Sequence, residues 1–420
     1  MTSEINAPPK VSWKNPKGMF TIPGGVTAAL GFSASGIAAG IKSASDRLDL
    51  ACLFADRPSS WAATLTTNRF AAAPVKLART LLRLGGPLQA VLVNSGNANA
   101  ATGPEGDRRA RQVAAAVARF LELPTGRVLV SSTGIIGRPL PADRIVRAVP
   151  EAVRTLEMSG GGLAAQAIMT TDTFVKEAAL EIRIGGRQVR IGGMCKGAGM
   201  IHPNMATMLA YITTDAVVSQ GLLRRLLSAA VERTFNRINI DGDQSTNDTV
   251  LLMAGGASGA RVPASGPDRE RFAAALNEIC RRLAELIVRD GEGATKLVEI
   301  AVTGARTDAD AHRVADAVAN SKLVKTAWFG QDLNWGRLAA AVGYAGVRVD
   351  PEKVSMSLNG KAVVAAGRSV SPARMARAAK EMKEPVLRFM IDLGIGTGSD
   401  KVLTCDLTHE YVSINAEYPT

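Results

Sequence analysis

Apolar residues along this chain recur with two different periods, which predict strands and helices in turn. Short apolar runs predict strands over residues 49–54, 61–67, 90–93, 128–130, 208–212, 249–253, 297–302, 385–393 and 402–407. Apolar residues at helical spacing predict helices over residues 74–84, 107–121, 142–156, 164–170, 222–235, 269–288 and 372–382. A strand, a polar loop and a helix follow one another at 90–121 and again at 128–156, an order that favours a site at the strand's end.

Turn residues add two hairpins, with strands at 176–184 and 188–191 around Gly185-Gly186 and at 354–358 and 361–364 around Asn359-Gly360. A turn around Pro58 separates the strands over 49–54 and 61–67. Residues 31–41 are small and fit a helix or an extended segment equally well. Residues 411–414 are interpreted as part of the closing strands.

Two polar loops follow the strands at 90–93 and 128–130. The first, at 94–99, is rich in asparagine and fits either a site or a turn of capping residues. The second, at 131–137, contains small residues whose backbone N–H groups can turn toward one point, as oxyanion stabilisation requires. It lacks the phosphate-loop pattern, and a purely structural loop fits it as well.

Composition limits the class of protein. The chain has 420 residues, of which 46% are hydrophobic and 4% aromatic, so it is expected to be a globular protein of two or three packed domains. No secretory signal and no apolar run long enough to span a bilayer is evident, which predicts a cytoplasmic protein without a membrane partner. Four widely spaced cysteines, at 52, 195, 280 and 405, are interpreted as core thiols.

The net charge of +12 raises the question of a nucleic-acid partner. Lys and Arg are spread over helix faces without interleaved aromatic residues, so no nucleic acid is expected. Only three histidines occur, none with metal-ligand or triad spacing, and the acidic loop at 241–248 lacks the pattern of a calcium site. The sequence therefore predicts no metal, and any nucleophilic mechanism needs a base other than imidazole.

The stretch 196–210 concentrates the candidate chemistry. Glycines and Pro203 lead to Ala206 and Thr207, after which an apolar run fits a central strand. Thr207 is a candidate to cut the chain at its own amino side and then act as an N-terminal nucleophile, with its free amine as the base. The alternative from spacing alone is an ordinary loop that leads into a buried strand.

Several motifs together resemble the ornithine acetyltransferase family of arginine biosynthesis, also called bifunctional ArgJ. The resemblance runs from about residue 16 to the last residue. The motifs lie at 94–103, 132–137, 169–173, 196–209, 290–296 and 414–418. One departure is the run 400–404, which leaves acceptor preference open.

The resemblance implies a layered α-β-β-α sandwich with a smaller C-terminal α/β subdomain, a fold shared with self-processing aminopeptidases. It implies cleavage between Ala206 and Thr207 into an alpha chain of residues 1–206 and a beta chain of residues 207–420. The reaction would move the acetyl group of N2-acetylornithine to glutamate through an acetyl-Thr207 intermediate. The alternative function is a self-processing aminopeptidase or amidase of the same fold.

The resemblance also assigns site residues. Thr133 and Gly134 would stabilise the oxyanion. Substrate contacts would come from Thr170 or Thr171, Lys196, Thr207, Glu292, Asn415 and Thr420. No cofactor is implied, although acetyl-CoA stays open as a co-substrate, and the two chains are expected to form an alpha2beta2 heterotetramer.

Overall fold

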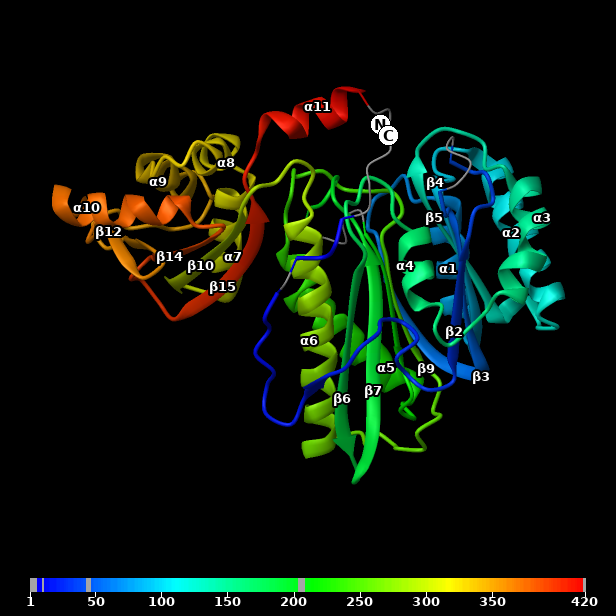
Figure 1. Ribbon diagram of the computed structural model, residues 1–420. Coiled ribbons are helices and arrows are strands. Elements are labelled where there is room, and N and C mark those ends of the chain that lie inside the picture. The colour runs from blue at the N-terminus through cyan, green and yellow to red at the C-terminus, as the bar shows by residue number, and fades with distance from the viewer. Residues whose placement is uncertain (1–5, 10, 43–46, 203–207, 418–420) are drawn as a thin grey trace.

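The structure is a computed structural model that describes residues 6–9, 11–42, 47–202 and 208–417. It contains a larger unit of layered sheets and helices and a smaller unit that lies beside it (Figure 1). The smaller unit has a hydrophobic core of its own, and the ends of its strands β10 (Leu297–Ala305) and β15 (Gly398–Cys405) also pack on a core of the larger unit.

The larger unit is built on nine strands in the order β1-β6-β7-β8-β9-β3-β4-β5, with β2 paired to β3. Their bounds are β1 Phe20–Thr21, β2 Phe32–Ile37, β3 Leu50–Leu65, β4 Leu88–Asn97, β5 Val128–Ile135, β6 Lys176–Ile184, β7 Arg187–Lys196, β8 Leu209–Thr214 and β9 Thr249–Ala254. The long strand β3 pairs with β4 mainly through its first half and with β9 through its second half. It therefore joins two halves of the sheet.

Three apolar layers separate these two halves and their helices. The helices of this unit are α1 Ala73–Leu84, α2 Gly103–Phe120, α3 Ala142–Arg154, α4 Gly161–Ala167, α5 Gln220–Arg233 and α6 Pro267–Arg289, with short 3-10 turns η1 Thr125–Arg127 and η2 Phe235–Arg237. Ile212 packs with α5 and α6, whereas its neighbour Tyr211 packs with Leu53 of the other half. Leu92 in turn packs outward with α2 and α3.

Successive residues of a strand point to opposite faces, so each half of the sheet contributes to two of these apolar layers. The order across the unit is helices α5 and α6, one half of the sheet, the other half, then helices α2 and α3. Figure 1 shows α6 at one side of the unit and α2 and α3 at the other. This arrangement confirms the predicted layered α-β-β-α fold.

The smaller unit confirms the predicted C-terminal α/β subdomain. Its sheet has the order β13-β12-β11-β14-β10-β15. The elements are β10 Leu297–Ala305, α7 Asp308–Asn320, α8 Lys322–Phe329, α9 Trp335–Gly343, β11 Ser355–Leu358, β12 Lys361–Ala365, β13 Arg368–Ser369, α10 Pro372–Ala379, η3 Lys380–Lys383, β14 Val386–Asp392 and β15 Gly398–Cys405. Trp328 of α8 stacks on Phe389 of β14, with ring centroids 5.7 Å apart.

The last described element corrects one prediction. Residues 411–414 belong to helix α11, His409–Glu417, and not to a strand. An apolar run of four residues does not distinguish the two structures by periodicity. Helix α11 follows β15 and crosses back above α6 toward the larger unit (Figure 1), and this path brings its side chains to the site described below.

Other predicted boundaries are also wrong. No turn forms at Pro58, because β3 continues through it with a register shift between Phe54 and Ser59. The polar loops at 94–99 and 131–137 are in large part strand, since β4 ends at Asn97 and β5 at Ile135. The undecided segment 31–41 contains strand β2. Helices α7, α8 and α9 were not predicted.

Within the described residues, no helix is long and apolar enough to cross a membrane.

Candidate active site

The carboxyl ends of β4 and β5 hold the predicted oxyanion residues. The two strands are parallel, and Thr133 pairs with Ser95 while Gly134 pairs with Gly96. Gly134 has φ +126°, and a Cβ at this position would lie 2.4 Å from the carbonyl carbon of Gly96. Only glycine fits both the backbone angle and this close approach. The backbone at 133–134 is therefore held by a tight contact between two strands.

Asparagine side chains fix the backbone around this contact. The Ser132 hydroxyl donates to the Asn94 side-chain oxygen at 2.6 Å, and the Asn94 amide donates to the Asn97 carbonyl at 2.9 Å. The Asn97 side-chain oxygen accepts from the Asn99 N–H at 2.8 Å. All four side chains are buried, so their hydrogen bonds replace those lost to water. The asparagine-rich stretch supports the neighbouring loop instead of forming an open turn.

Lys196 lies at the end of β7, with 3% of its surface exposed. Its Nζ donates to the Thr170 hydroxyl at 2.6 Å and lies 3.8 Å from an Asp172 carboxylate oxygen. Burial lowers the pKa of Lys196, and the charge of Asp172 opposes that shift. Lys196 is thus a buried lysine beside a carboxylate, and in its protonated form it can bind a substrate carboxylate strongly.

A buried cluster of charged residues, Asp172, Lys176 and Asp290, lies next to Lys196. Lys176 donates to Asp172 at 2.6 Å and also to Asp290, and all three side chains are almost fully buried. Asp172 also accepts from the Gly197 N–H at 2.6 Å. Burial alone would raise the pKa of Asp172, but Lys176 and Lys196 hold it well below its usual range. The cluster connects the segment around 170–176 to the end of α6 and fixes the backbone next to Lys196.

Glu292 and Asn415 meet on the other side of this region. The Asn415 side-chain amide of α11 donates to a Glu292 carboxylate oxygen at 2.7 Å. A Cβ at Gly199 would lie 2.4 Å from that oxygen, so the glycine makes room for the carboxylate. The charge of Glu292 acts on the pKa of Lys196. A cation and an anion therefore face one region, as recognition of an amino acid requires.

The strand that follows the predicted nucleophile begins beside Lys196. Leu209 of β8 pairs with Lys196 of β7, and the Met208 N–H donates to the Asp248 carboxylate at 2.8 Å. Residues 203–207, and with them Ala206 and Thr207, lie outside the described residues, as does Thr420. Met208 is the first described residue after this gap.

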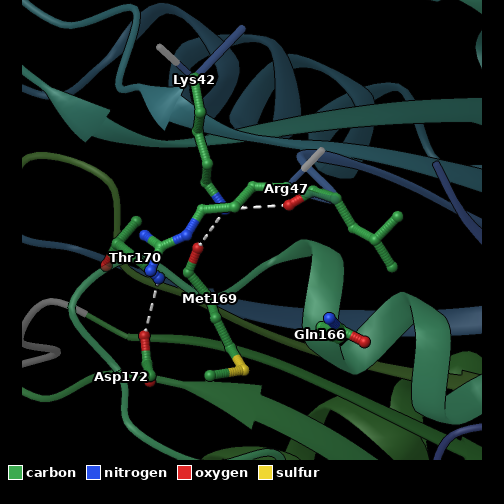
Figure 2. Close-up of a pocket in the computed structure, with 7 residues that line it drawn as sticks. Lys42, Arg47, Gln166, Met169, Thr170 and Asp172 are labelled. Atoms are coloured by element: carbon green, nitrogen blue, oxygen red, sulfur yellow. Dashed lines mark hydrogen bonds between the residues drawn. The ribbon is translucent and has the colours of Figure 1, made fainter. Parts of the chain in front are cut away.

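A small pocket of about 40 Å³ borders the same region. Figure 2 shows Thr170 and Asp172 at one side of it and Lys42 at the other, with Gln166 on the helix below. The Lys42 Nζ donates to the carbonyls of Met169 and Leu48 at 2.8 and 2.9 Å. Burial lowers the pKa of Lys42 to about 8.

The structure brings together Thr170, Lys196, Glu292 and Asn415, and it places Thr133 and Gly134 at neighbouring strand ends. Thr171 is half-buried, and the structure records no side-chain hydrogen bond from it to a described residue. Sequence reasoning missed the ion cluster of Asp172, Lys176 and Asp290. The available signal was Lys176, a charged residue at the start of the largely buried strand β6, which indicates a buried partner of opposite charge.

Comparisons with known proteins identify the class. The model of the ArgJ family matches residues 33–420. The arginine biosynthesis bifunctional protein ArgJ of Gloeobacter violaceus is 46% identical over 401 residues, which cover 95% of this chain and 98% of that protein. The protein of the same name from Symbiobacterium thermophilum is 47% identical over 401 residues, with 95% and 99% covered. A crystal structure of the arginine biosynthesis bifunctional protein ArgJ from Bacillus halodurans is 41% identical in sequence. The match covers 49% of the present chain and 97% of the chain in that crystal structure, with a TM-score of 0.47.

These relatives define an acyltransferase of arginine biosynthesis that acts on small-molecule substrates. The chain belongs to the ArgJ family.

Proposed function

We propose that this enzyme transfers the acetyl group of N2-acetylornithine to glutamate, through an acetyl ester on Thr207. The observation that carries the proposal is the buried cation Lys196, which pairs with the strand that begins just after Thr207 and lies in the electrostatic field of Glu292. The opposite charges of these two groups match the carboxylate and the ammonium of an amino-acid substrate.

The nucleophile would be released by self-cleavage. The Thr207 hydroxyl attacks the Ala206 carbonyl, the C–N bond breaks, and an ester with a free Thr207 amine forms. Water then hydrolyses the ester, which leaves an alpha chain of residues 1–206 and a beta chain of residues 207–420. The new amine has an ordinary pKa of about 7.7 to 8.0, so part of it is neutral near physiological pH and can act as a base.

Acetyl transfer would follow in two steps. The Thr207 amine takes the hydroxyl proton while the oxygen attacks the acetyl carbonyl, and ornithine leaves with that proton on its amine. Glutamate then attacks the acetyl ester through its amine and leaves as N-acetylglutamate. Both tetrahedral intermediates carry an oxyanion, which the backbone at Thr133 and Gly134 would stabilise. This ping-pong order needs no cofactor, and acetyl-CoA is a second candidate donor for the same ester.

Substrate recognition would divide between the two charged groups. Lys196, supported by Thr170, would bind the α-carboxylate that donor and acceptor share. Glu292, held by Asn415, would bind the side-chain ammonium of ornithine. Thr420 is proposed to complete the site from the C-terminus.

Denaturing mass spectrometry and a transfer assay test the proposal together. The wild type should appear as two fragments of nearly equal size, one of which begins at Thr207, and should form N-acetylglutamate from acetylornithine and glutamate. Thr207→Ala should stay uncut and inactive, and Thr207→Ser should retain both properties in part. Thr326→Ala, at an exposed threonine of α8, is the control and should behave as wild type.

A fully active uncut chain would refute the nucleophile. Cleavage of peptide substrates without acetyl transfer would instead identify an aminopeptidase or amidase. Native mass spectrometry of the cleaved protein tests the proposed alpha2beta2 assembly, which predicts two copies of each fragment.

A further inference from the structure

Two consecutive buried residues, Asn247 and Asp248, lie directly before strand β9. Each side chain holds the backbone of a different part of the candidate site. Asn247 contacts the strand that carries the oxyanion residues, and Asp248 contacts the residue that follows Thr207. Both side chains are buried, with 6% and 0% of the residue surface exposed.

The Asn247 side chain fixes the peptide before Thr133. Its Nδ2 donates to the carbonyls of Ser132 and Ala98, both at 2.7 Å, and its Oδ1 accepts from the Thr246 hydroxyl at 2.5 Å. In a planar trans peptide the C=O and the N–H point in opposite directions. Holding the Ser132 carbonyl therefore also sets the direction of the Thr133 N–H.

The Asp248 side chain fixes the peptide after Thr207. Its Oδ1 accepts from the Met208 N–H at 2.8 Å, and the next residue, Thr249, donates its N–H to the Met208 carbonyl at 3.1 Å. Met208 is thus held at both its N–H and its C=O. These contacts fix the backbone of Met208, the first described residue after position 207.

We propose that Asn247-Asp248 is a positioning element that sets the separation between the oxyanion donors and the Thr207 nucleophile. Neither side chain needs to touch the substrate, since each acts through a backbone group, Ser132 on one side and Met208 on the other. The inference rests on the proposed function, because it takes Thr207 as the nucleophile and Thr133 and Gly134 as the oxyanion residues.

The element should act on kcat and leave KM nearly unchanged. The groups proposed to bind substrate, Lys196 and Glu292, lie on β7 and after α6, where Thr170 and Asn415 hold them by hydrogen bonds. The charge of Asp248 also acts on the pKa of Lys196, but less than the charges of Asp172 and Glu292 do. A misplacement of about 1 Å between reacting groups can cost about 10²-fold in rate. Loss of either hydrogen-bonded contact should therefore lower kcat by about that factor.

The experiment compares Asn247→Ala, Asp248→Ala and Asp248→Asn with wild type, in a steady-state assay of acetyl transfer. The two alanine variants should lose about 10²-fold in kcat, with KM within about twofold. Asp248→Asn should recover most of kcat, because an amide oxygen still accepts the Met208 N–H. Its pH profile of kcat should match wild type, since positioning does not require an ionisable group.

Asn359→Ala is the matched control. The side-chain amide of Asn359 also holds backbone groups of a neighbouring strand: it donates to the Val386 carbonyl and accepts from the Arg388 N–H at 2.9 Å. Asn359 lies in the smaller unit. This variant should lower Tm and keep kcat. If Asn247→Ala does not fold, Asn247→Ser and the Asp248 pair carry the test.

Three results would overturn the proposal while wild type is cleaved and active. The first is unchanged kcat in Asn247→Ala and Asp248→Ala, and the second is equal loss in Asp248→Asn and Asp248→Ala. The third is an altered pH profile in Asp248→Asn, which would indicate a proton-transfer role. A wild type that is neither cleaved nor active would refute the proposed function instead.

Discussion

Gly134→Ala is the sharpest test of the oxyanion site. The substitution places a Cβ 2.4 Å from the Gly96 carbonyl carbon and 2.6 Å from the Asn97 nitrogen. Both neighbours are backbone atoms of a buried strand, so they cannot move aside as a flexible side chain would. The added methyl must therefore displace the backbone at 133–134 itself.

The expected magnitude follows from this displacement. Ordinary contact for a Cβ begins at 3.4 Å, so the two strands must separate by about 1 Å. Loss of one well-placed oxyanion donor costs about 10²–10³-fold in kcat, or about 3 to 4 kcal/mol of transition-state stabilisation. We expect a kcat lower by that factor for Gly134→Ala, with a much smaller change in KM.

Gly137→Ala is the control within the same loop. Its φ of +83° also disfavours an L residue, but no atom lies within 4 Å of the added Cβ. It should lose about 1 to 2 kcal/mol of stability from the backbone angle alone and retain kcat. The assay is steady-state transfer from acetylornithine to glutamate, with thermal unfolding measured in parallel.

Two outcomes would refute the reasoning. If Gly134→Ala keeps kcat within about twofold of wild type, the backbone at 133–134 does not stabilise the transition state. If Gly137→Ala loses as much kcat as Gly134→Ala, the effect comes from loop strain and not from the close contact with Gly96.

Three further predictions concern the charged groups of the site. Lys176→Met leaves Asp172 and Asp290 buried without their shared cation, and should lower the free energy of unfolding by about 3–5 kcal/mol in urea denaturation; a loss below about 1 kcal/mol would contradict the buried cluster. Burial lowers the pKa of Lys42 to about 8 in the folded protein, whereas its ordinary value in the unfolded chain is 10.5. Between these two pH values Lys42 is protonated in the unfolded chain and mostly neutral in the folded protein, so the free energy of unfolding rises with pH. Lys42→Met should remove this rise in thermal unfolding, and an identical pH dependence in both proteins would disprove it. Thr170→Val frees the Lys196 Nζ and should raise KM for both substrates, whereas Thr171→Val should match wild type; the reverse result would assign the contact to Thr171.

The periodicity of apolar residues predicted the elements whose apolar face is formed within one continuous segment of sequence. Helices α5 and α6 have long apolar stripes and were predicted within a few residues of their observed bounds. Strand β3 was divided in two, because Pro58 reads as a turn. Its continuity depends on pairing with β4 and then β9, which lie far away in the sequence.

The candidate site shows the same limit. The resemblance to ornithine acetyltransferases named Thr170, Lys196, Glu292 and Asn415, which the structure brings together. The position of Lys176 at the start of a buried strand was a signal, but its partner Asp290 could not be predicted, because the two residues are 114 positions apart. Partners of this kind are defined only by the fold. The roles of all these site residues stay predictions, and Ala206, Thr207 and Thr420 also lie outside the described residues.

The order of strands in the larger sheet has a consequence for refolding. Strands β8 and β9 follow the proposed cleavage point, yet they lie between β7 and β3, which precede it. The two products would therefore share the centre of one sheet, and the two apolar layers against its centre would need side chains from both products. Once cut, the enzyme would refold only when two separate chains meet, so recovery from denaturation should become second order in protein concentration, unlike that of the uncut precursor.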